Sequence, residues 1–440
     1  MTKTIVIIGA GFAGLQLARR LKNEGYNIII TDQYNFHQFQ PLLYQVATAR
    51  LEPSAISFPL RKVFQNRKDV HVRITKVNRI DTAARQVITQ DGTFNYDYLV
   101  IATGCTSNFF GNKQIEQYAY PMKSTNEAIA LRNRILLNFE DALNATEEEL
   151  EEIMNIVVVG GGATGVELAG SLAEMKKNVL PRDYHDMDFS KLTVYLLEGA
   201  GHTLQNMSSA SQARSQEYLE SMGVKILLNT VVENYDGHVV QLKNGETIRT
   251  RNLIWTAGVK GNVPEGIPET SIVRGNRIRV DEMNRVEGLE QVFALGDIAY
   301  METKEWPKGH AQLANVANNQ AKNLAKNFVR MLKGQPLQPF TYKNPGTMAT
   351  VGKRKAVVDL PFMSFQGRMA WFTWMFLHLM LILSVKNKLM IFINWAISYF
   401  TNDTTLRLIL LPTEKEVEQA EVHNGINSRD VLPLPVNNAA

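Results

Sequence analysis

The sequence predicts an α/β protein, mainly because one pattern of elements occurs twice along the chain. The apolar run Ile5–Ile8 is typical of a buried strand, the glycine turn Gly9-Ala10-Gly11-Phe12-Ala13-Gly14 follows it, and a helix is expected from Leu15 to about Asn23. A second apolar run, Ile28–Ile30, leads to an acid at Asp32. The same order of strand, glycine turn, helix, strand and acid returns near residue 160. Two such repeats predict two Rossmann-like domains with parallel sheets.

Each repeat has the layout that binds a dinucleotide. A glycine turn lets the backbone approach a pyrophosphate, the N-terminus of the following helix faces the phosphates, and the acid after the second strand binds a ribose. In the first repeat we therefore expect the glycine turn, Asp32 and the adjacent Gln33 to contact a dinucleotide cofactor.

The second repeat has the same features with a longer loop. Its first strand is Ile156–Val159, its turn is Gly160-Gly161-Gly162-Ala163-Thr164-Gly165, and its second strand, Thr193–Leu197, ends at Glu198. The gap before the acid is longer than usual because of a charged loop over residues 178–191. Since a carboxylate at position 198 would repel a 2′-phosphate, this site should prefer NADH to NADPH.

Three further strands end in residues that could border the two dinucleotide sites. The strand Tyr98–Ile101 runs into Ala102-Thr103-Gly104, and Leu253–Trp255 runs into Thr256-Ala257-Gly258. Small residues at a strand end let a second segment approach a bound dinucleotide closely. A strand over residues 291–295 ends in Gly296-Asp297. The Asp297 carboxylate is expected to bind a ribityl hydroxyl, with a helix N-cap as the alternative.

Composition excludes several classes of protein. A chain of 440 residues can form two or three domains, and its net charge of +4 does not indicate a nucleic-acid partner. Cys105 is the only cysteine, so it should be a buried, inert thiol, and a dithiol redox mechanism is excluded. No metal site is expected, since no cluster of metal-ligating residues surrounds His310. No signal peptide precedes Ile5, which suggests a cytoplasmic enzyme body.

Two other stretches give coarser predictions. Residues 124–152 are expected to form a helix that begins with an N-cap at Ser124 and Glu127. Residues 35–45 are rich in aromatic and amide side chains, and they could form either a wall against a planar ligand or an ordinary packed loop. The sequence alone leaves both interpretations open.

The C-terminal part predicts two apolar helices at a membrane surface. Residues 369–385 and 389–402 have no formal charge, and both runs are shorter than the ~20 residues of a membrane span. Four cations and one anion lie between residues 362 and 411. Apolar, aromatic helices with basic edges suit the membrane interface, with a dimer interface or a core helix as the alternative. The tail from 412 to 440 is polar.

Two dinucleotide sites in one chain indicate a flavoprotein that is reduced by a nicotinamide. FAD should occupy the first site, and NADH the second, where Gly160, Gly162, Thr164, Gly165, Glu198 and Gly258 are expected to contact it. The segment from Gly309 to Gln320 is expected to run into a helix that ends near Leu332, with its N-terminus at the flavin. Hydride would pass from the nicotinamide to the flavin. Because there is no cysteine pair or metal cluster, a membrane quinone is the natural electron acceptor.

These motifs resemble those of the type II NADH:quinone oxidoreductases, which do not pump protons. The most specific segments are residues 39–48, Gly160 to Glu167, and residues 370–399. The resemblance implies that Glu167 acts beside the flavin and nicotinamide and that Val77 and Ala317 also contact FAD. It also implies a homodimer, peripheral on the cytoplasmic face of the bacterial inner membrane, with menaquinone or ubiquinone as substrate.

The sequence departs from the family at the helix start that faces the quinone. The family usually has Ala-Gln-x-Ala-x-Gln there, whereas this chain has Ala314-Asn315-Val316-Ala317-Asn318-Asn319. Asn315 and Asn319 keep the amide group on a shorter arm, so quinone reduction could be slow, tuned to another quinone, or assisted by Gln312 or Gln320. The alternative is a soluble reductase with a ferredoxin, rubredoxin or other acceptor. A redox-sensing protein with slow NADH turnover is a third interpretation.

The expected domain order follows from the two repeats. An FAD-binding domain is predicted over residues 1–120 and 271–345, with an NADH-binding domain inserted at 121–270. A membrane-anchoring and dimerisation region over 346–411 and the polar tail complete the chain.

Overall fold

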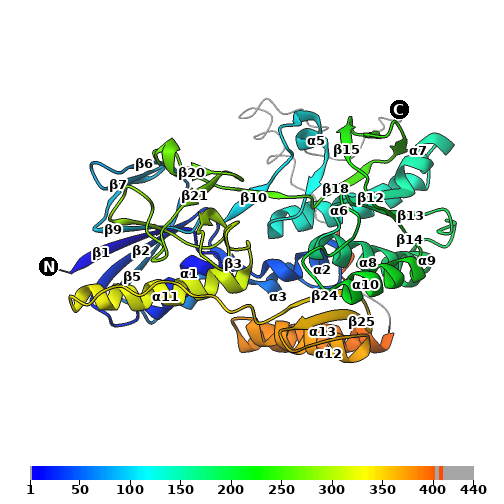
Figure 1. Cartoon of the computed structure of the whole chain (residues 1–440). Coiled ribbons are helices and arrows are strands. Elements are labelled where there is room, and N and C mark those ends of the chain that lie inside the picture. Colours follow the sequence, from blue (N-terminus) through cyan, green and yellow to red (C-terminus); the bar gives the residue numbers. More distant parts are fainter. Residues whose placement is uncertain (1, 402–405, 410–440) are drawn as a thin grey trace, which may run out of the picture. The chain divides into compact units, whose positions relative to one another are not determined.

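The computed structural model describes residues 2–401 and 406–409, and the chain divides into two compact units (Figure 1). Unit 1 consists of Met1–Gln38, Ser57–Asn108 and Val259–Asn344. Unit 2 consists of Phe39–Ile56, Phe109–Gly258 and Pro345–Ala440. The segment Phe39–Ile56 therefore belongs to unit 2, although it lies within the predicted first domain. The predicted tail over 412–440 lies outside the described residues.

Unit 1 is built on a parallel sheet with the strand order β22-β9-β1-β2-β5. Its strands are β1 (Lys3–Ile8), β2 (Tyr26–Asp32), β5 (Val70–Ile74), β9 (Tyr98–Ile101) and β22 (Val292–Ala294). The side chains of Ile5, Val6 and Ile7 are fully buried, as a strand covered on both faces requires. The helices α1 (Phe12–Arg20) and α11 (Ala314–Leu332) pack against each other in this unit.

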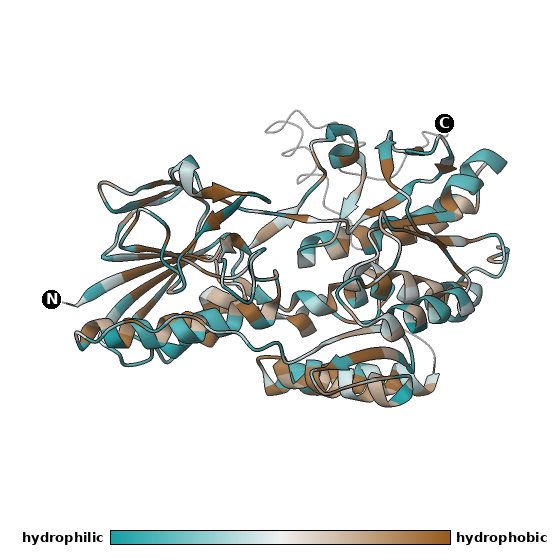
Figure 2. Ribbon diagram, viewed as in Figure 1, coloured by the Kyte–Doolittle hydropathy of each residue, from teal (hydrophilic) through white to brown (hydrophobic). Residues whose placement is uncertain are grey.

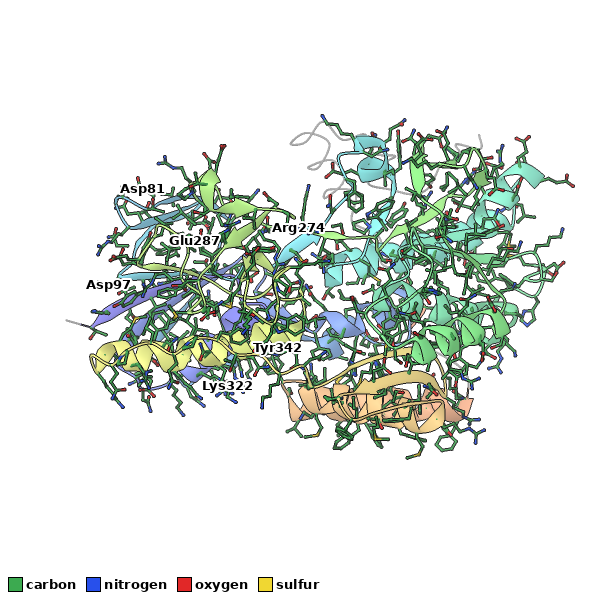
Figure 3. All side chains as sticks on the ribbon, in the orientation of Figure 1. Asp81, Asp97, Arg274, Glu287, Lys322 and Tyr342 are labelled. Carbon is green, nitrogen blue, oxygen red and sulfur yellow. The ribbon has the colours of Figure 1, made fainter. Side chains whose placement is uncertain are left out.

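Smaller elements surround the sheet of unit 1. They are β3 (Phe36–Gln38), β4 (Ser57–Pro59), α4 (Leu60–Val63), β6 (Val77–Asp81), β7 (Gln86–Thr89), β8 (Gly92–Asn95), β10 (Cys105–Ser107), β19 (Val259–Gly261), η2 (Glu269–Ser271), β20 (Ile272–Val273), β21 (Arg277–Arg279), η3 (Gly296–Ile298) and β23 (Ala299–Tyr300). One core cluster joins Val6 of β1, Val87 of β7 and Ile278 of β21. Exposed charged side chains such as Asp97, Glu287 and Lys322 lie outside this core (Figure 3).

Unit 2 repeats the same architecture with the strand order β11-β18-β12-β13-β14. Its strands are β11 (Tyr120–Pro121), β12 (Asn155–Val159), β13 (Thr193–Leu197), β14 (Val224–Leu227) and β18 (Asn252–Trp255), and a small sheet is formed by β15 (Val232–Tyr235), β16 (Val239–Leu242) and β17 (Thr247–Arg249). Its helices are η1 (Gln40–Leu42), α2 (Leu43–Ala47), α3 (Pro53–Ile56), α5 (Lys113–Tyr118), α6 (Thr125–Ala142), α7 (Glu147–Ile153), α8 (Ala163–Asn178), α9 (Leu180–Asp183) and α10 (Ser209–Ser221). In both central sheets the strands are hydrophobic (Figure 2).

The C-terminal part of unit 2 is an antiparallel sheet followed by two helices. Its elements are β24 (Thr347–Gly352), β25 (Lys355–Leu360), β26 (Met363–Gln366), α12 (Arg368–Leu381) and α13 (Val385–Thr401). Asn387 on α13 is buried, and its Nδ2 donates to the carbonyl oxygens of Ser54 and Ala55 at 3.1 and 2.9 Å. These bonds hold α13 against α3. None of the described helices combines the length and the apolar character that a membrane span requires.

Two of the predicted elements differ from those found. The helix expected over residues 124–152 is divided into α6 and α7, because each begins with its own capping box. Ser124 and Glu127 form the first box, as predicted, and Thr146 and Glu149 form the second. A capping box satisfies backbone N–H groups that a continuous helix would bond internally, so it starts a new helix. The expected loop at 178–191 contains the short helix α9.

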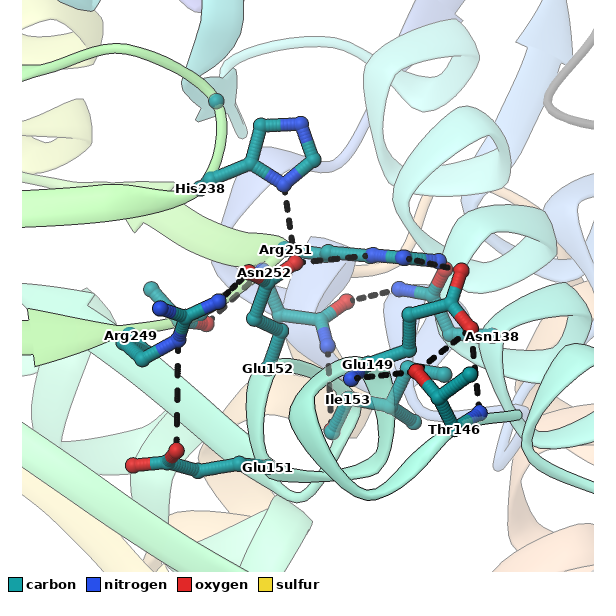
Figure 4. A network of polar contacts seen from close by, with 12 residues as sticks. Asn138, Thr146, Glu149, Glu151, Glu152, Ile153, His238, Arg249, Arg251 and Asn252 are labelled. Carbon is teal, nitrogen blue, oxygen red and sulfur yellow. Dashed lines mark hydrogen bonds and ion pairs between the residues drawn. The ribbon is translucent and has the colours of Figure 1, made fainter.

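A buried carboxylate joins α7 to the strands of unit 2 (Figure 4). Glu152 is 4% exposed, and it accepts hydrogen bonds from His238 at 2.8 Å, Arg249 at 2.7 Å and Arg251 at 3.1 Å. Burial raises the pKa of Glu152, but the hydrogen bonds from His238 and Arg251 outweigh it, so the pKa stays below its ordinary value. The folded protein therefore stabilises the charged carboxylate.

We expect the substitution Glu152→Gln to lower the free energy of unfolding by about 2 kcal/mol at neutral pH, since hydrogen bonds to charged groups contribute ~1.5–3 kcal/mol and two of these partners are half-exposed. Urea unfolding measures this loss. Glu151→Gln is the matched control, because Glu151 is exposed and makes a 3.9 Å contact with Arg249. The loss should vanish as the pH falls through the lowered pKa of Glu152. Equal stabilities of the two variants would contradict the expectation.

Candidate active site

The glycine turn of unit 1 brings β1, β2 and β9 together at one point. Gly9 has a φ of 98°, and its N–H donates to the Thr31 carbonyl at 2.7 Å. A Cβ at Gly9 would lie 2.4 Å from the Ala102 carbonyl oxygen, so only glycine fits there. At the N-cap of α1, no atom lies within 4 Å of where a Gly11 Cβ would be, and no side chain caps the helix. The turn therefore leaves room for a phosphate ahead of a helix N-terminus.

Polar groups with unmet hydrogen-bonding capacity gather at the same edge. The Asp32 carboxylate accepts the Ala10 N–H at 2.6 Å and the Tyr34 N–H at 2.9 Å, and burial raises the pKa of Asp32. The hydroxyl of Thr103 is buried and has no hydrogen-bond partner within the described part of the chain. A dinucleotide with ribose and phosphate oxygens fits this edge, because it would supply the missing partners.

The second glycine turn reproduces this geometry in unit 2. Gly160 has a φ of 107°, its N–H donates to the Leu197 carbonyl at 2.8 Å, and a Cβ there would lie 2.8 Å from the Ala257 backbone. The Glu198 carboxylate accepts the Gly161 N–H at 2.6 Å, as Asp32 accepts that of Ala10. Gly162 again forms a helix N-cap without a side-chain bond. Unit 2 therefore has a second edge that fits a dinucleotide.

The Gly-Asp end of β22 adds a carboxylate in unit 1. Asp297 lies in η3, whose N-cap is Leu295, so the alternative role of Asp297 as a helix N-cap is not found. Instead its carboxylate accepts the Cys105 thiol at 3.0 Å. Cys105 is half-exposed rather than buried, so its expected burial is wrong: the hydrogen bond places the thiol beside a carboxylate at the edge of the unit.

The amide residues near the start of α11 are positioned by backbone contacts. Asn319 Nδ2 donates to the Asn315 carbonyl at 2.8 Å, and Asn315 is exposed. Gln312 donates to the Asp297 carbonyl at 3.1 Å, and buried Gln320 accepts the Gly296 N–H at 2.7 Å. The two glutamines therefore support η3, whereas the side chain of Asn315 is accessible. Ala317 is buried beside Gly296.

Three other predicted or noted residues lie elsewhere in unit 1. Gln33 follows Asp32 at the end of β2 and is exposed, and Val77 begins β6 and is half-buried. His310 is buried among Trp306, Phe340 and Tyr342. Within the described ranges no group of three or more histidine, cysteine and carboxylate side chains could hold a metal ion.

Glu167 is a buried acid on the first turns of α8 in unit 2. It is 8% exposed, and its carboxylate accepts the Thr350 N–H of β24 at 3.3 Å. Strand β24 reaches α8 so closely because of Gly170, where a Cβ would lie only 1.7 Å from the Val351 carbonyl oxygen. The glycine thus allows β24 to cover Glu167.

Burial raises the pKa of Glu167 to about 8, although the Thr350 N–H and the Trp374 indole oppose the shift. The Trp374 nitrogen lies near Glu167 but has no hydrogen bond of good geometry to any described residue. The charge of Glu167 also contributes, after burial, to a Tyr44 pKa well above its ordinary value. Glu167 can therefore exist in both protonation states near neutral pH, whereas Tyr44 stays protonated.

An ordered set of side chains packs next to this acid. Trp395 of α13 donates to Gln45 Oε1 at 2.8 Å, and Gln45 Nε2 donates to the Tyr44 hydroxyl at 2.8 Å. All three residues line a narrow cavity that also reaches Glu167, Thr350 and Trp374. Within residues 35–45, Tyr44 and Gln45 thus line a cavity, whereas His37 is a packed side chain that bonds the Ala10 carbonyl at 3.0 Å.

The comparisons with known proteins agree with this geometry. Residues 3–321 match the pyridine nucleotide-disulphide oxidoreductase family, and residues 345–402 match the NDH2 C-terminal domain. The type II NADH:quinone oxidoreductase NdhA of Mycobacterium tuberculosis is 34% identical over 90% of this chain and 87% of the relative. The chain belongs to the type II NADH:quinone oxidoreductases. The oxidoreductase Ndh of the same organism is 32% identical over 90% of this chain and 88% of its own.

Solved structures of this family share the fold. NDH2 from Plasmodium falciparum in complex with NADH has a TM-score of 0.85 at 20% identity, and the match covers 93% of this chain and 100% of the other. The predicted fold class is therefore confirmed, with FAD and NADH as the cofactors of the enzyme.

Sequence reasoning missed most neighbours of Glu167. Thr350, Trp374 and Trp395 come from three elements that lie far along the chain, in apolar or unassigned runs for which the sequence predicts no role beside Glu167. The useful signal was the pair of tryptophans within two apolar helices, since a buried indole N–H requires a polar partner.

We expect Gly170→Ala to displace β24 from α8, because the added methyl group would overlap the Val351 carbonyl. The stability should fall by about 1–3 kcal/mol, as for other overpacked sites. Thermal unfolding measures the loss, with Gly162→Ala as the control, since a Cβ there has nothing within 4 Å. A variant as stable as the control would contradict the close approach.

Proposed function

We propose that the enzyme binds FAD at the edge of unit 1 and NADH at the edge of unit 2, and that it passes two electrons from NADH to a membrane quinone. The repeated strand, glycine turn, helix, strand and acid, with equivalent bonds at Asp32 and Glu198, is the observation that supports this assignment most. Bound FAD would accept the hydride from NADH and pass the electrons on. The protein positions both cofactors.

The proposed FAD contacts follow from unit 1. The glycine turn leaves space for the pyrophosphate, Asp32 accepts from the adenosine ribose, and the exposed Gln33 and half-buried Val77 border the adenosine half. Thr103, Gly104 and Ala317 would hold the isoalloxazine half, which would give the buried Thr103 hydroxyl a hydrogen-bond partner. The Asp297 carboxylate, which accepts the Cys105 thiol, would also accept a ribityl hydroxyl.

The proposed NADH contacts follow from unit 2. The pyrophosphate binds at the N-terminus of α8, where its proposed contacts are Gly160, Gly162, Thr164 and Gly165. Gly258, which follows the end of β18, is a further proposed contact. Glu198 accepts from the ribose hydroxyls through a carboxylate that the Gly161 N–H already orients at 2.6 Å. A 2′-phosphate would bring two negative charges together there, so NADH is preferred to NADPH.

The proposed quinone chemistry uses an acid and two amides. Glu167 donates a proton to the reduced quinone, for which a pKa of about 8 is suitable at neutral pH. Asn315 and Asn319 orient a quinone carbonyl from the start of α11, and Asn315 has the accessible side chain that this role needs. The quinone is either menaquinone or ubiquinone.

The proposed membrane contact is the exposed apolar face of α12 and α13. Trp374, Ile391 and Trp395 are buried, whereas large apolar residues on the other faces are 41–83% exposed. They are Met369, Phe372, Phe376, Leu377, Met380, Leu381, Val385, Leu389, Phe392, Ile393, Ile397 and Phe400. Such a surface suits a peripheral position on the cytoplasmic face of the inner membrane, and part of it also suits a homodimer interface.

The function is tested by turnover of the purified enzyme and of Glu198→Gln. The wild type should be yellow, be bleached by NADH, and reduce a short-chain quinone with NADH but only weakly with NADPH. Loss of the Glu198 charge should lower kcat/KM for NADH about tenfold or more, because a charged hydrogen bond contributes ~1.5–3 kcal/mol. The substitution should also lower the ratio of kcat/KM for NADH to kcat/KM for NADPH. NADH oxidation without quinone reduction in the wild type would refute the function.

Membrane binding is tested by a double substitution on the exposed face. Phe376 and Phe400 are 67% and 81% exposed, so Phe376→Asp/Phe400→Asp should weaken binding to phospholipid vesicles about a hundredfold or more, since burial of each phenyl ring contributes ~1.5–3 kcal/mol. Vesicle co-sedimentation measures the partition. The control is Leu143→Asp, an exposed apolar residue at the end of α6. Equal sedimentation of both variants would exclude this face as the membrane contact.

A further inference from the structure

Reduction of a quinone by NADH consumes one proton from solvent. The hydride brings two electrons and one proton, and a quinol needs two electrons and two protons, so NADH, a quinone and one H⁺ give NAD⁺ and a quinol. This inference rests on the proposed function. Glu167 is 8% exposed and therefore needs a path along which solvent protons reach it after each turnover.

The cavity beside Glu167 has the size of a water path. Its volume is about 40 Å³, which is enough for about three water molecules. Ordinary ligand pockets have roughly 300 Å³ or more. The cavity is lined by Arg50, whose side chain is 22% exposed, and by half-buried Lys353 and Tyr399. It therefore extends from the buried acid to partly exposed residues and is too small for a quinone ring.

One face of α8 presents two polar groups to this cavity. Glu167 and Ser171 both line it and are four residues apart, a spacing at which Cβ atoms lie about 5–6 Å from each other. Ser171 is 2% exposed and lines the cavity one turn beyond Glu167. At this distance one water molecule can bridge the hydroxyl and the carboxyl.

The hydrogen bonds of Ser171 leave its oxygen able to accept a hydrogen bond from water. Its Oγ lies 2.7 Å from Thr48 Oγ1, and Thr48 donates its own hydroxyl proton to the Tyr44 carbonyl at 2.8 Å. Ser171 is therefore the donor to Thr48, and its lone pairs can accept from water in the cavity. The Ser171 proton therefore points to Thr48 and not toward Glu167, so Ser171 holds a cavity water in place by accepting a hydrogen bond from it.

The outer end of the cavity is fixed by a charged pair. Arg50 forms an ion pair with Glu174, and Glu174 also accepts the Lys353 N–H. The titratable groups around Glu167 are thus Tyr44 and Arg50 from the α2 segment, Glu174 from α8, Lys353 from the turn after β24, and His378 from α12. Burial lowers the pKa of His378 to about 4, so that imidazole is uncharged at neutral pH.

We propose that this cavity is the proton inlet of the enzyme: water molecules in it carry solvent protons from beside Arg50 and Glu174 to the carboxyl of Glu167, and Ser171 holds that water in place. Ser171 acts through water on Glu167 and is a positioning residue.

The test compares Ser171→Ala with Ser215→Ala in the full-length holoenzyme. Ser215 is also fully buried in unit 2, does not line the cavity, and its hydroxyl has no partner among the described residues. Ser171→Ala should lower kcat for quinone reduction about tenfold, less than the loss of a general acid itself, with KM for the quinone unchanged. The loss should deepen as the pH rises, and the solvent isotope effect should grow. Reduction of ferricyanide, which takes up no proton, is the reference for hydride transfer.

A second readout does not depend on turnover. The infrared carbonyl band of protonated Glu167, identified by its absence in Glu167→Gln, should shift more slowly after mixing with D₂O in Ser171→Ala than in Ser215→Ala. Equal exchange rates and equal pH profiles of the Ser171→Ala and Ser215→Ala variants would overturn the proposal that this cavity is the proton inlet. A raised KM for quinone with kcat unchanged would show instead that the cavity binds the quinone. A wild type that reduces ferricyanide but no quinone would refute the proposed function, and the infrared comparison would still decide the inlet.

Discussion

The close approach of β24 to α8 is the contact on which the chemistry of unit 2 depends. Gly170 allows the Val351 carbonyl to lie where a Cβ would otherwise be. The neighbouring Thr350 N–H then reaches Glu167, and the strand excludes solvent from the acid. Without this contact Glu167 would lose part of its cover, and its pKa would move down toward the ordinary value near 4. A glycine on the covered face of one helix thus contributes to the burial that lets the acid hold a proton at neutral pH.

The dinucleotide edges could be predicted from the sequence in detail, because the signals are local. A glycine with positive φ, a helix that begins at the next turn and an acid after the second strand are all within about forty residues of one another in each repeat. The structure reproduces the same bonds twice, from Ala10 to Asp32 and from Gly161 to Glu198. Steric limits on the backbone determine such motifs, and those limits are visible in residue types.

The surroundings of Glu167 could not be predicted, because they depend on contacts between distant segments. Gln45 and Trp395 are 350 positions apart in the chain and bond at 2.8 Å. No periodicity relates them, and the segment Phe39–Ile56 lies within a stretch whose neighbours on both sides belong to unit 1. The break between α6 and α7 was missed for the opposite reason: its signal, Thr146 and Glu149, is local, but continuous helical periodicity conceals it. The half-exposed thiol of Cys105 depends on the tertiary position of Asp297.

The two sides of the C-terminal helices α12 and α13 have different surroundings, and this explains their composition. On the inward side of α12 and α13, Trp374 and Trp395 line the small cavity beside Glu167, and Asn387 bonds the carbonyls of Ser54 and Ala55, so all three residues are buried. The outward side is mainly apolar, and the exposed charges Arg368 and Lys386 lie near the N-terminal ends of the two helices. An amphipathic helix in water would have the reverse order, with its apolar stripe inward. A surface of this kind is stable only when another apolar phase or chain covers it. The polar contacts of Trp395 and Asn387 to Gln45, Ser54 and Ala55 hold α13 to the rest of unit 2.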